Sequence, residues 1–224
     1  MLAAFSLDRT PLETAERVRL FVNTPGILTI DLPEKRMVVA CDRYGAALRT
    51  VMLDGKQEIS IRDCHDVFYY DVVKPSPDSA FRTQLDSHVK SIEASHASAK
   101  ALAPIMDGKI WSRYQSSADV AGFPHLITIT LDAPQEIAGL TVISETGLDT
   151  GLRNFDISVL DTDGNWTDVR NCLPTWTHWA KEQGFERAIF PFTPVTTQEI
   201  RLKINTANMG WNGYEIHEIS LQYP

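Results

Sequence analysis

The stretch APIMDGKIWSRYQSS, residues 103–117, has the composition of a loop that leads into a β-strand. Asp107 and Gly108 favour a tight turn, because aspartate bonds to nearby backbone groups and glycine accepts positive φ. Asp107 and Ser112 carry the hard oxygen atoms that Ca²⁺ prefers, and Tyr114 offers a large ring to a core. On its own the string is compatible with an ordinary turn or with the edge of a cation site.

The length and composition are those of a globular protein. The 224 residues have room for one large domain or two modest ones, and 43% hydrophobic with 22% charged residues is typical of a folded chain. No apolar run approaches the roughly 18 residues of a membrane-spanning helix, so we expect no membrane span. The first residues, MLAAFSLDRTP, lack a basic segment followed by a long apolar one, so no secretory signal is predicted.

The charge and the cysteines argue against two classes of protein. A net charge of −8, with lysines and arginines scattered singly, argues against binding to a nucleic acid. Cys41, Cys64 and Cys172 form neither a disulfide framework nor a metal-binding CxxC pair. Cys41 and Cys64 could pair in an exported protein, but isolated buried thiols are the simpler interpretation.

The first third of the chain contains short segments of alternating polarity, which are VRLFV, ILTIDL, MVVAC, ALRTVML, QEISI and VFYYDVV. Turn-forming residues separate them at 23–26, where a hairpin is expected, and at 42–45 and 54–55. This spacing predicts a small antiparallel β-sandwich of unknown role over residues 1–75. Residues 76–90 are polar and lack alternation, which indicates a linker between domains.

Residues 91–224 continue the β pattern. Ile127, Ile129 and Leu131 alternate with polar residues, as strands of an antiparallel sandwich do when one face is buried. Trp166 follows a turn sequence and is predicted to be a core ring behind a hairpin. Helical periodicity is nearly absent, so we predict an all-β chain with two sandwich domains.

The second domain resembles the discoidin domain, also called the coagulation factor 5/8 C-terminal type, which in bacterial proteins is carbohydrate-binding module family 32. Four blocks in the family's order carry the resemblance, and they are MDGKIWSRYQSS, HLITITLDAPQEIAGLTVIS, LRNFDISVLDTDGNWTDV, and FTPVTTQEIRLKI with GYEIHEISL. The resemblance implies a galactose-binding-like jelly-roll sandwich over residues 91–224. It also favours an extracellular or cell-surface location.

The resemblance further implies a structural Ca²⁺ ion beneath the ligand-binding loops. Asp107 and Ser112 match the family's positions in the first block, and Glu218 matches its late glutamate. Two carboxylates and a hydroxyl, completed by backbone carbonyls, could fill six or seven oxygen positions. Lys109 departs from the pattern, because an acidic or amide residue often follows the Asp-Gly pair in the family. The alternative is a turn held by hydrogen bonds without an ion.

The usual galactose site of the family is not present in this sequence. Galactose-binding members carry a histidine after the tryptophan of the first block, an aromatic residue shortly beyond it, and an arginine and an asparagine before the third block. Here Tyr114 stands at the tryptophan position, Gln115 at the histidine position and Ala118 at the aromatic position. The loop ETGLDTG, residues 145–151, contains neither the arginine nor the asparagine. Family membership therefore does not predict galactose as the ligand.

Aromatic residues in two other loops are candidates for stacking on a sugar ring. The GWNGY segment contains Trp211, and the long loop at 173–186 contains Trp176 and Trp179. The alternative is that these tryptophans cover the sandwich or pack against the first domain. The candidate ligand-binding residues are Trp111, Arg113, Gln115, Glu145, Trp176, Trp179, Trp211, Asn212 and Tyr214.

No catalytic motif is present, since the sequence lacks GxSxG, HExxH, a P-loop and a dinucleotide fingerprint. We therefore predict no catalytic residues and expect a non-catalytic carbohydrate-binding module, an appendage of a glycan-degrading enzyme. The expected partner is a glycan or oligosaccharide. The alternative is a module for protein–protein interaction or assembly, with a protein partner or a second copy of the chain. A catalytic site between the two domains is a third hypothesis.

Overall fold

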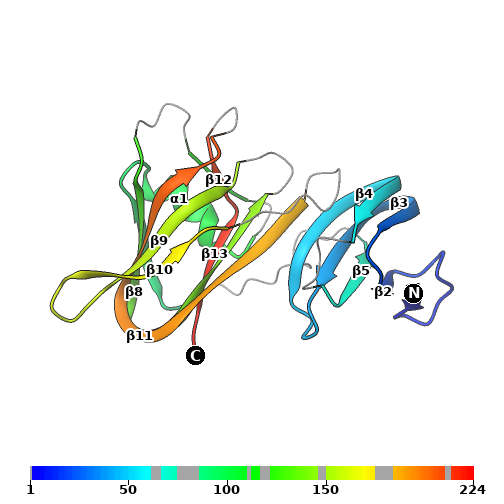
Figure 1. Ribbon diagram of the computed structural model, residues 1–224, viewed down its shortest axis with the longest axis horizontal. Coiled ribbons are helices and arrows are strands. Elements are labelled where there is room, and N and C mark those ends of the chain that lie inside the picture. Colours follow the sequence, from blue (N-terminus) through cyan, green and yellow to red (C-terminus); the bar gives the residue numbers. More distant parts are fainter. Residues whose placement is uncertain are drawn as a thin grey trace. The chain divides into compact units, whose positions relative to one another are not determined.

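The computed structural model describes most of the chain, as residues 2–61, 67–74, 86–109, 112–116, 122–145, 150–174, 184–209 and 213–224. Of the described residues, about 66% are in strands and 4% in helices, so the predicted all-β class is confirmed. The chain divides into two compact units (Figure 1). The first comprises Met1–Arg82 together with Thr177–Arg187, and the second comprises Thr83–Trp176 and Ala188–Pro224.

The first unit contains a continuous antiparallel arrangement in the order β1-β2-β5-β3-β4. Its strands are β1 (Leu2–Ser6), β2 (Arg17–Val22), β3 (Ile27–Cys41), β4 (Ala47–Ser60) and β5 (Tyr69–Val73). One face of these strands forms the core of the unit, because Leu20, Val38, Val51, Tyr70 and Val72 are buried against one another. This agrees with the alternation of the sequence, in which every second residue is apolar.

Two expectations for the first unit are wrong. The Asp54–Gly55 pair is not a turn between strands, because β4 runs through it. Gly55 has φ of 67° and lies opposite a register shift in β3 between Leu32 and Arg36, so the pair belongs to an irregularity inside a long hairpin. The expected hairpin of β2 with β3 does not form either. Instead β5 pairs with both strands.

A segment from late in the chain completes the first unit. The start of β11 (Gly184–Ala207) pairs antiparallel with β4, with Phe185 opposite Thr50 and Glu186 opposite Arg49. The Arg49 and Glu186 side chains form a buried ion pair at 3.2 Å. The first unit is therefore discontinuous in sequence, and this late segment is one of its strands.

The second unit contains the remaining strands and its own core. Its elements are β6 (Val89–Ala94), α1 (Ala99–Leu102), η1 (Ala103–Met106), β7 (Tyr114–Gln115), β8 (His125–Glu145), β9 (Leu152–Leu160), β10 (Trp166–Cys172), β11 from Ala188 on, β12 (Glu215–Ile216) and β13 (Glu218–Gln222). Antiparallel pairs join β6 and β13 to β8, and β10 and β11 to β9. Ile127, Ile129 and Leu131 are fully buried, as their alternation predicts.

Trp166 and its neighbours have a structural role. The turn before β10 is closed by Asp161, whose Oδ1 accepts hydrogen bonds from the N–H groups of Asp163 and Asn165. The guanidinium carbon of Arg201 lies 3.6 Å from the centre of the Trp166 ring, which is a cation–π contact. The Trp166 ring therefore packs against β11, although its side chain is only partly buried.

Within the described residues, two cysteines are present as thiols and no helix could span a membrane. Cys41 and Cys172 are buried free thiols, and burial raises the pKa of Cys41 to about 11 and that of Cys172 to about 12. Cys64 lies outside the described residues. Of the helices described, none has the length and apolar character needed to cross a bilayer.

Candidate functional site

The loop after η1 gathers an excess of oxygen atoms. Ser112 Oγ lies 2.8 Å from both carboxylate oxygens of Asp107 and 2.7 Å from the carbonyl oxygen of Lys109. A hydroxyl carries one proton, so it cannot fully satisfy three acceptors at once. Lys109 contributes its backbone groups, with its N–H donating to Asp107 Oδ1 at 2.8 Å, while its side chain is exposed.

Glu218, at the start of β13, points its carboxylate at the same loop. The residue is 3% exposed, and burial raises its pKa to about 8, with the negative charge of Asp107 adding to the shift. The N–H groups of Gly108 and Lys109 donate to this carboxylate and oppose the shift. Its Oε2 atom is buried without a hydrogen-bond partner among the described residues. The structure thus brings Asp107, Ser112 and Glu218 together at one loop.

These three residues fit a hard cation. An unpartnered buried carboxylate oxygen, a nearby second carboxylate and a crowded hydroxyl are each stabilised by a positive charge at their centre. Within the described ranges there is no cluster of three or more His, Cys, Asp or Glu side chains suited to a metal. A cation at this loop would therefore depend on hydroxyl and carbonyl oxygens besides the two carboxylates, which is the donor set of Ca²⁺ rather than of Zn²⁺.

Two exposed polar side chains lie on the short β7–β12 pair. Arg113, just before β7, donates from Nε to Glu215 Oε1 at 3.1 Å, and the Glu215 side chain is only 2% exposed. His217 Nε2 lies 3.8 Å from Glu215 Oε2. Gln115 is exposed and pairs with Glu215 across the two strands. Arg113 is therefore held from beneath by a buried carboxylate, while 43% of its side chain remains open to solvent.

Tyr214 is buried, which contradicts its predicted role as a ligand-binding residue. Its side chain has no exposed surface, and its hydroxyl lies 2.9 Å from His96 Nε2 and 3.2 Å from His125 Nδ1. The two histidine rings stack with centroids 4.1 Å apart. Desolvation by burial lowers the pKa of His96 to about 4 and also lowers that of His125. Sequence reasoning missed both histidines, because only the fold brings them to Tyr214.

Gly213 fixes the approach of β12 to β7. Its φ is 111°, and a Cβ atom there would lie 2.0 Å from the carbonyl oxygen of Ser116. Ser116 also bonds to Tyr214, the residue that follows Gly213. The backbone N–H of Ser116 donates to the carbonyl oxygen of Tyr214, and the N–H of Tyr214 donates to Ser116 Oγ, both at 2.9 Å. The glycine is therefore required by close contact as well as by its backbone conformation.

Several candidate ligand-binding residues lie outside the described residues, namely Trp111, Trp176, Trp179, Trp211 and Asn212. The side chain of Glu145 is likewise not described. Whether these tryptophans converge on one rim stays a prediction. Arg113 and Gln115 are the candidate residues that the structure places on an exposed surface.

Comparison with known structures places the second unit among carbohydrate-binding modules in fold. One similar structure is CBM32-3 from a family 31 glycoside hydrolase of Clostridium perfringens, with 17% identity over 64% of this chain and 96% of that one and a TM-score of 0.50. Another is the family 32 module of Streptococcus pneumoniae EndoD, with 16% identity, coverage of 63% and 100%, and a TM-score of 0.48. A pectin-binding module has 21% identity, coverage of 61% and 91%, and a TM-score of 0.46.

At these identities the structures show the fold alone. A comparison with curated protein sequences finds no significant match. The sequence profile of the F5/8 type C domain, however, matches residues 88–219, which is more than half of the chain. The match spans the Asp107 loop, the β7–β12 pair and the start of β13. This chain therefore belongs to the F5/8 type C domain family.

Proposed function

We propose that this chain is a non-catalytic carbohydrate-binding module that recognises a glycan through loops beside the β7–β12 pair. The observation that carries the proposal is Arg113, a half-exposed guanidinium held in position by the buried Glu215. A donor fixed from beneath loses little conformational entropy when it bonds to a sugar hydroxyl. Gln115 adds an exposed amide on the neighbouring strand position.

Similar structures support the proposal without defining the ligand. One of them is a family 32 module of Clostridium perfringens NanJ in complex with galactose. This chain has Gln115 where galactose-binding members carry histidine, so we expect a glycan other than a terminal galactose bound in the usual manner. One of the other similar modules belongs to a glycoside hydrolase, which supports a role for this chain as an appendage of a glycan-degrading enzyme.

We also propose that Asp107, Ser112 and Glu218 hold a structural Ca²⁺ ion. Support comes from the unpartnered Oε2 of Glu218, which lies in a buried site that a second carboxylate makes more negative. When bound, the ion would neutralise the two carboxylates and fix the loop between η1 and β7. The protein's own residues would still provide all contacts to the glycan.

A glycan array followed by calorimetric titration of the full chain tests the carbohydrate proposal. We expect binding of at least one oligosaccharide, and an Arg113→Gln variant should bind it about tenfold more weakly, as is typical for loss of a charge-assisted hydrogen bond. Arg170→Gln, at an exposed arginine of β10, is the matched control and should bind normally. A folded chain that binds no saccharide on the array would overturn the proposal.

A further inference from the structure

The first unit presents a second face of its sheet, opposite its core. Because side chains alternate along a strand, Arg17, Arg19 and Phe21 of β2 point away from the buried Val18, Leu20 and Val22 side. Arg19 lies between Phe5 of β1 and Asp71 of β5 in the strand register. Towards β1 and β2 this face is open, since Phe5 is 53% exposed.

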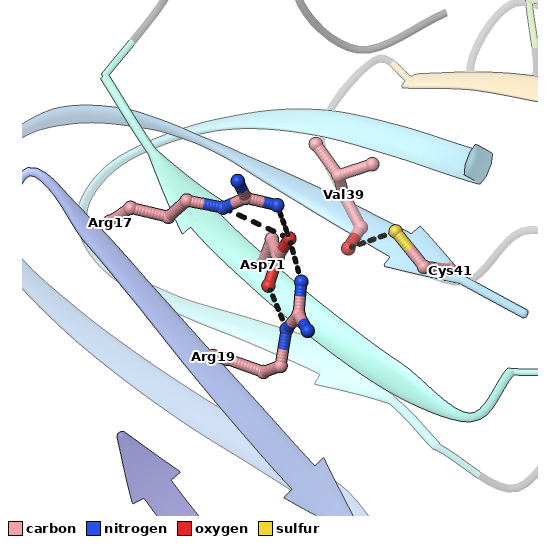
Figure 2. Close-up of polar contacts among 5 residues, drawn as sticks. All are labelled: Arg17, Arg19, Val39, Cys41 and Asp71. Atoms are coloured by element: carbon pink, nitrogen blue, oxygen red, sulfur yellow. Dashed lines mark hydrogen bonds and ion pairs between the residues drawn. The ribbon is translucent and has the colours of Figure 1, made fainter. Parts of the chain in front are cut away.

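Two arginines on this face converge on one buried carboxylate (Figure 2). Arg19 donates from Nε to Asp71 Oδ1 at 2.8 Å and from Nη2 to Oδ2 at 3.0 Å, which is a bidentate pair. Arg17 donates to Oδ2 from Nε at 3.2 Å and also from Nη2. Asp71 is therefore saturated with donors, and the three side chains together carry one net positive charge.

Both guanidinium groups keep a donor free for a ligand. The outer Nη1 atoms of Arg17 and Arg19 have no partner among the described residues, and 51% of the Arg17 side chain is exposed. A cation–π contact also holds Arg19, because its guanidinium carbon lies 3.8 Å from the centre of the Tyr69 ring. These contacts orient the two free donors before any ligand arrives, which reduces the entropy cost of binding.

Exposed aromatic rings adjoin the two arginines. The Phe5 and Phe21 ring centroids are 6.0 Å apart, and those of Phe21 and Phe68 are 5.8 Å apart. Phe5 and Phe68 are both more than half exposed. The open face therefore combines exposed apolar rings with a positive group, in a chain whose net charge is −8. Surfaces of this kind select an anion that is attached to an apolar ring face.

We propose that this face binds a uronic acid residue of an acidic saccharide, with the carboxylate on Nη1 of Arg17 near the guanidinium of Arg19 and the sugar ring against the exposed Phe5 ring. A uronic acid carries its carboxylate on a rigid ring that has an apolar face, so one residue makes both contacts. An acidic peptide carries its carboxylates on flexible side chains without such a face. The inference rests on the proposed carbohydrate-binding function and adds a second site, in the first unit, with a stated ligand class.

Calorimetric titration of the full chain with oligogalacturonate, and separately with its fully methyl-esterified form, tests the inference. The two probes share a backbone and differ in charge, so we expect the acid to bind at least tenfold more tightly than the ester. Arg17→Gln should weaken binding of the acid about tenfold, because it removes one charge-assisted contact while Arg19 keeps its bidentate pair with Asp71. Phe5→Ala should weaken binding of the acid severalfold.

The matched control is Arg43→Gln, which removes an exposed arginine in the turn between β3 and β4 and should leave binding unchanged. Equal losses in the Arg17 and Arg43 variants would overturn the inference, because they indicate non-specific charge attraction. Equal binding of acid and ester would do the same. Competition by millimolar sulfate or by polyglutamate at the affinity of the saccharide would also overturn it, in favour of an unselective anion site or an acidic peptide.

This outcome is separable from that of the proposed function. If Arg113→Gln abolishes binding of a neutral glycan while Arg17→Gln changes nothing for the acid, the carbohydrate-binding function stands and the second site falls. If no saccharide of either kind binds, both fall.

Discussion

The hydroxyl of Tyr214 lies 2.9 Å from Nε2 of His96, and this contact ties the end of the GWNGY segment to the start of the second unit. His125 Nδ1 lies 3.2 Å from the same hydroxyl, and its ring stacks on that of His96. A hydroxyl has one proton to donate, so the neutral forms of the two histidines suit this arrangement. The buried cluster beside the β7–β12 pair is therefore sensitive to protonation.

The first prediction concerns stability at low pH. The pKa of His96 in the folded chain is about 4, below the usual 6.5, so its contribution is fully present above pH 6.5 and is lost as pH falls towards 4. We expect a change from pH 7 to pH 5 to lower the melting temperature of the wild-type protein relative to that of a His96→Gln variant. Thermal unfolding of both proteins at several pH values measures the difference.

The comparison of variants is needed because the contribution of Glu218 to stability changes with pH in the opposite direction to that of His96. Its pKa is raised to about 8, so its contribution is present below pH 4.5 and is lost as pH rises through 8. An identical slope in the His96 and wild-type proteins contradicts the assignment.

The second prediction concerns the cation. Addition of Ca²⁺ to chelator-treated protein should raise the melting temperature, because a ligand at one hundred times its Kd adds about 2.7 kcal/mol to the free energy of unfolding. Glu218→Gln should remove most of this response, since it replaces a buried ligand carboxylate by an amide. Differential scanning calorimetry with and without Ca²⁺ is the measurement, and Mg²⁺ at equal concentration is the control. A wild-type protein whose melting temperature ignores Ca²⁺ would rule out the ion.

The third prediction concerns Gly213. Substitution by alanine should lower the free energy of unfolding by more than about 3 kcal/mol, because positive φ costs 1–3 kcal/mol and the new Cβ also meets Ser116 O at 2.0 Å. Gly164→Ala is the matched control, since φ there is 81° and nothing lies within 4 Å of the new atom. Urea unfolding of both variants separates the clash from the backbone cost. Equal losses in the two variants would show that the contact with Ser116 relaxes freely.

The fourth prediction concerns the strand that β11 supplies to the first unit. Glu186→Ala should lower the free energy of unfolding by about 3–5 kcal/mol, because it leaves the buried Arg49 without its carboxylate. Glu16→Ala is the control, because its pair with Lys74 is exposed and is expected to be worth less than about 1 kcal/mol. Hydrogen exchange of β4 amides should rise in the Glu186 variant only. Unchanged exchange of β4 would contradict its pairing with β11.

The sequence predicts those features that local patterns encode. Alternation identifies the buried faces of the strands, as at Ile127 and Ile129, and the four family blocks identify the fold of the second unit. The same blocks predict that Glu218 meets the Asp107 loop. These features repeat along the chain or recur in a whole family, so one sequence is enough to find them.

Other features depend on partners that are distant in the chain. An aromatic ring between glycine and polar residues gives the same pattern whether it is exposed or buried, so the pattern alone does not reveal that Tyr214 is buried. Asp54–Gly55 has the composition of a turn, yet β4 continues through it. The irregularity is taken up by a register shift in the opposite strand, β3. The pairing of Glu186 with Arg49 leaves no mark in either local pattern.

The discontinuity of the first unit has a consequence for biosynthesis. A ribosome releases the chain from its N-terminus, and Gly184–Glu186 emerge only after most of the second unit has been made. Until then the edge of β4 that pairs with β11 is open, and the Glu186 carboxylate is not available to the Arg49 guanidinium. The first unit is therefore expected to stay incomplete while residues 83–176 of the second unit are made, although most of its own strands are translated before them.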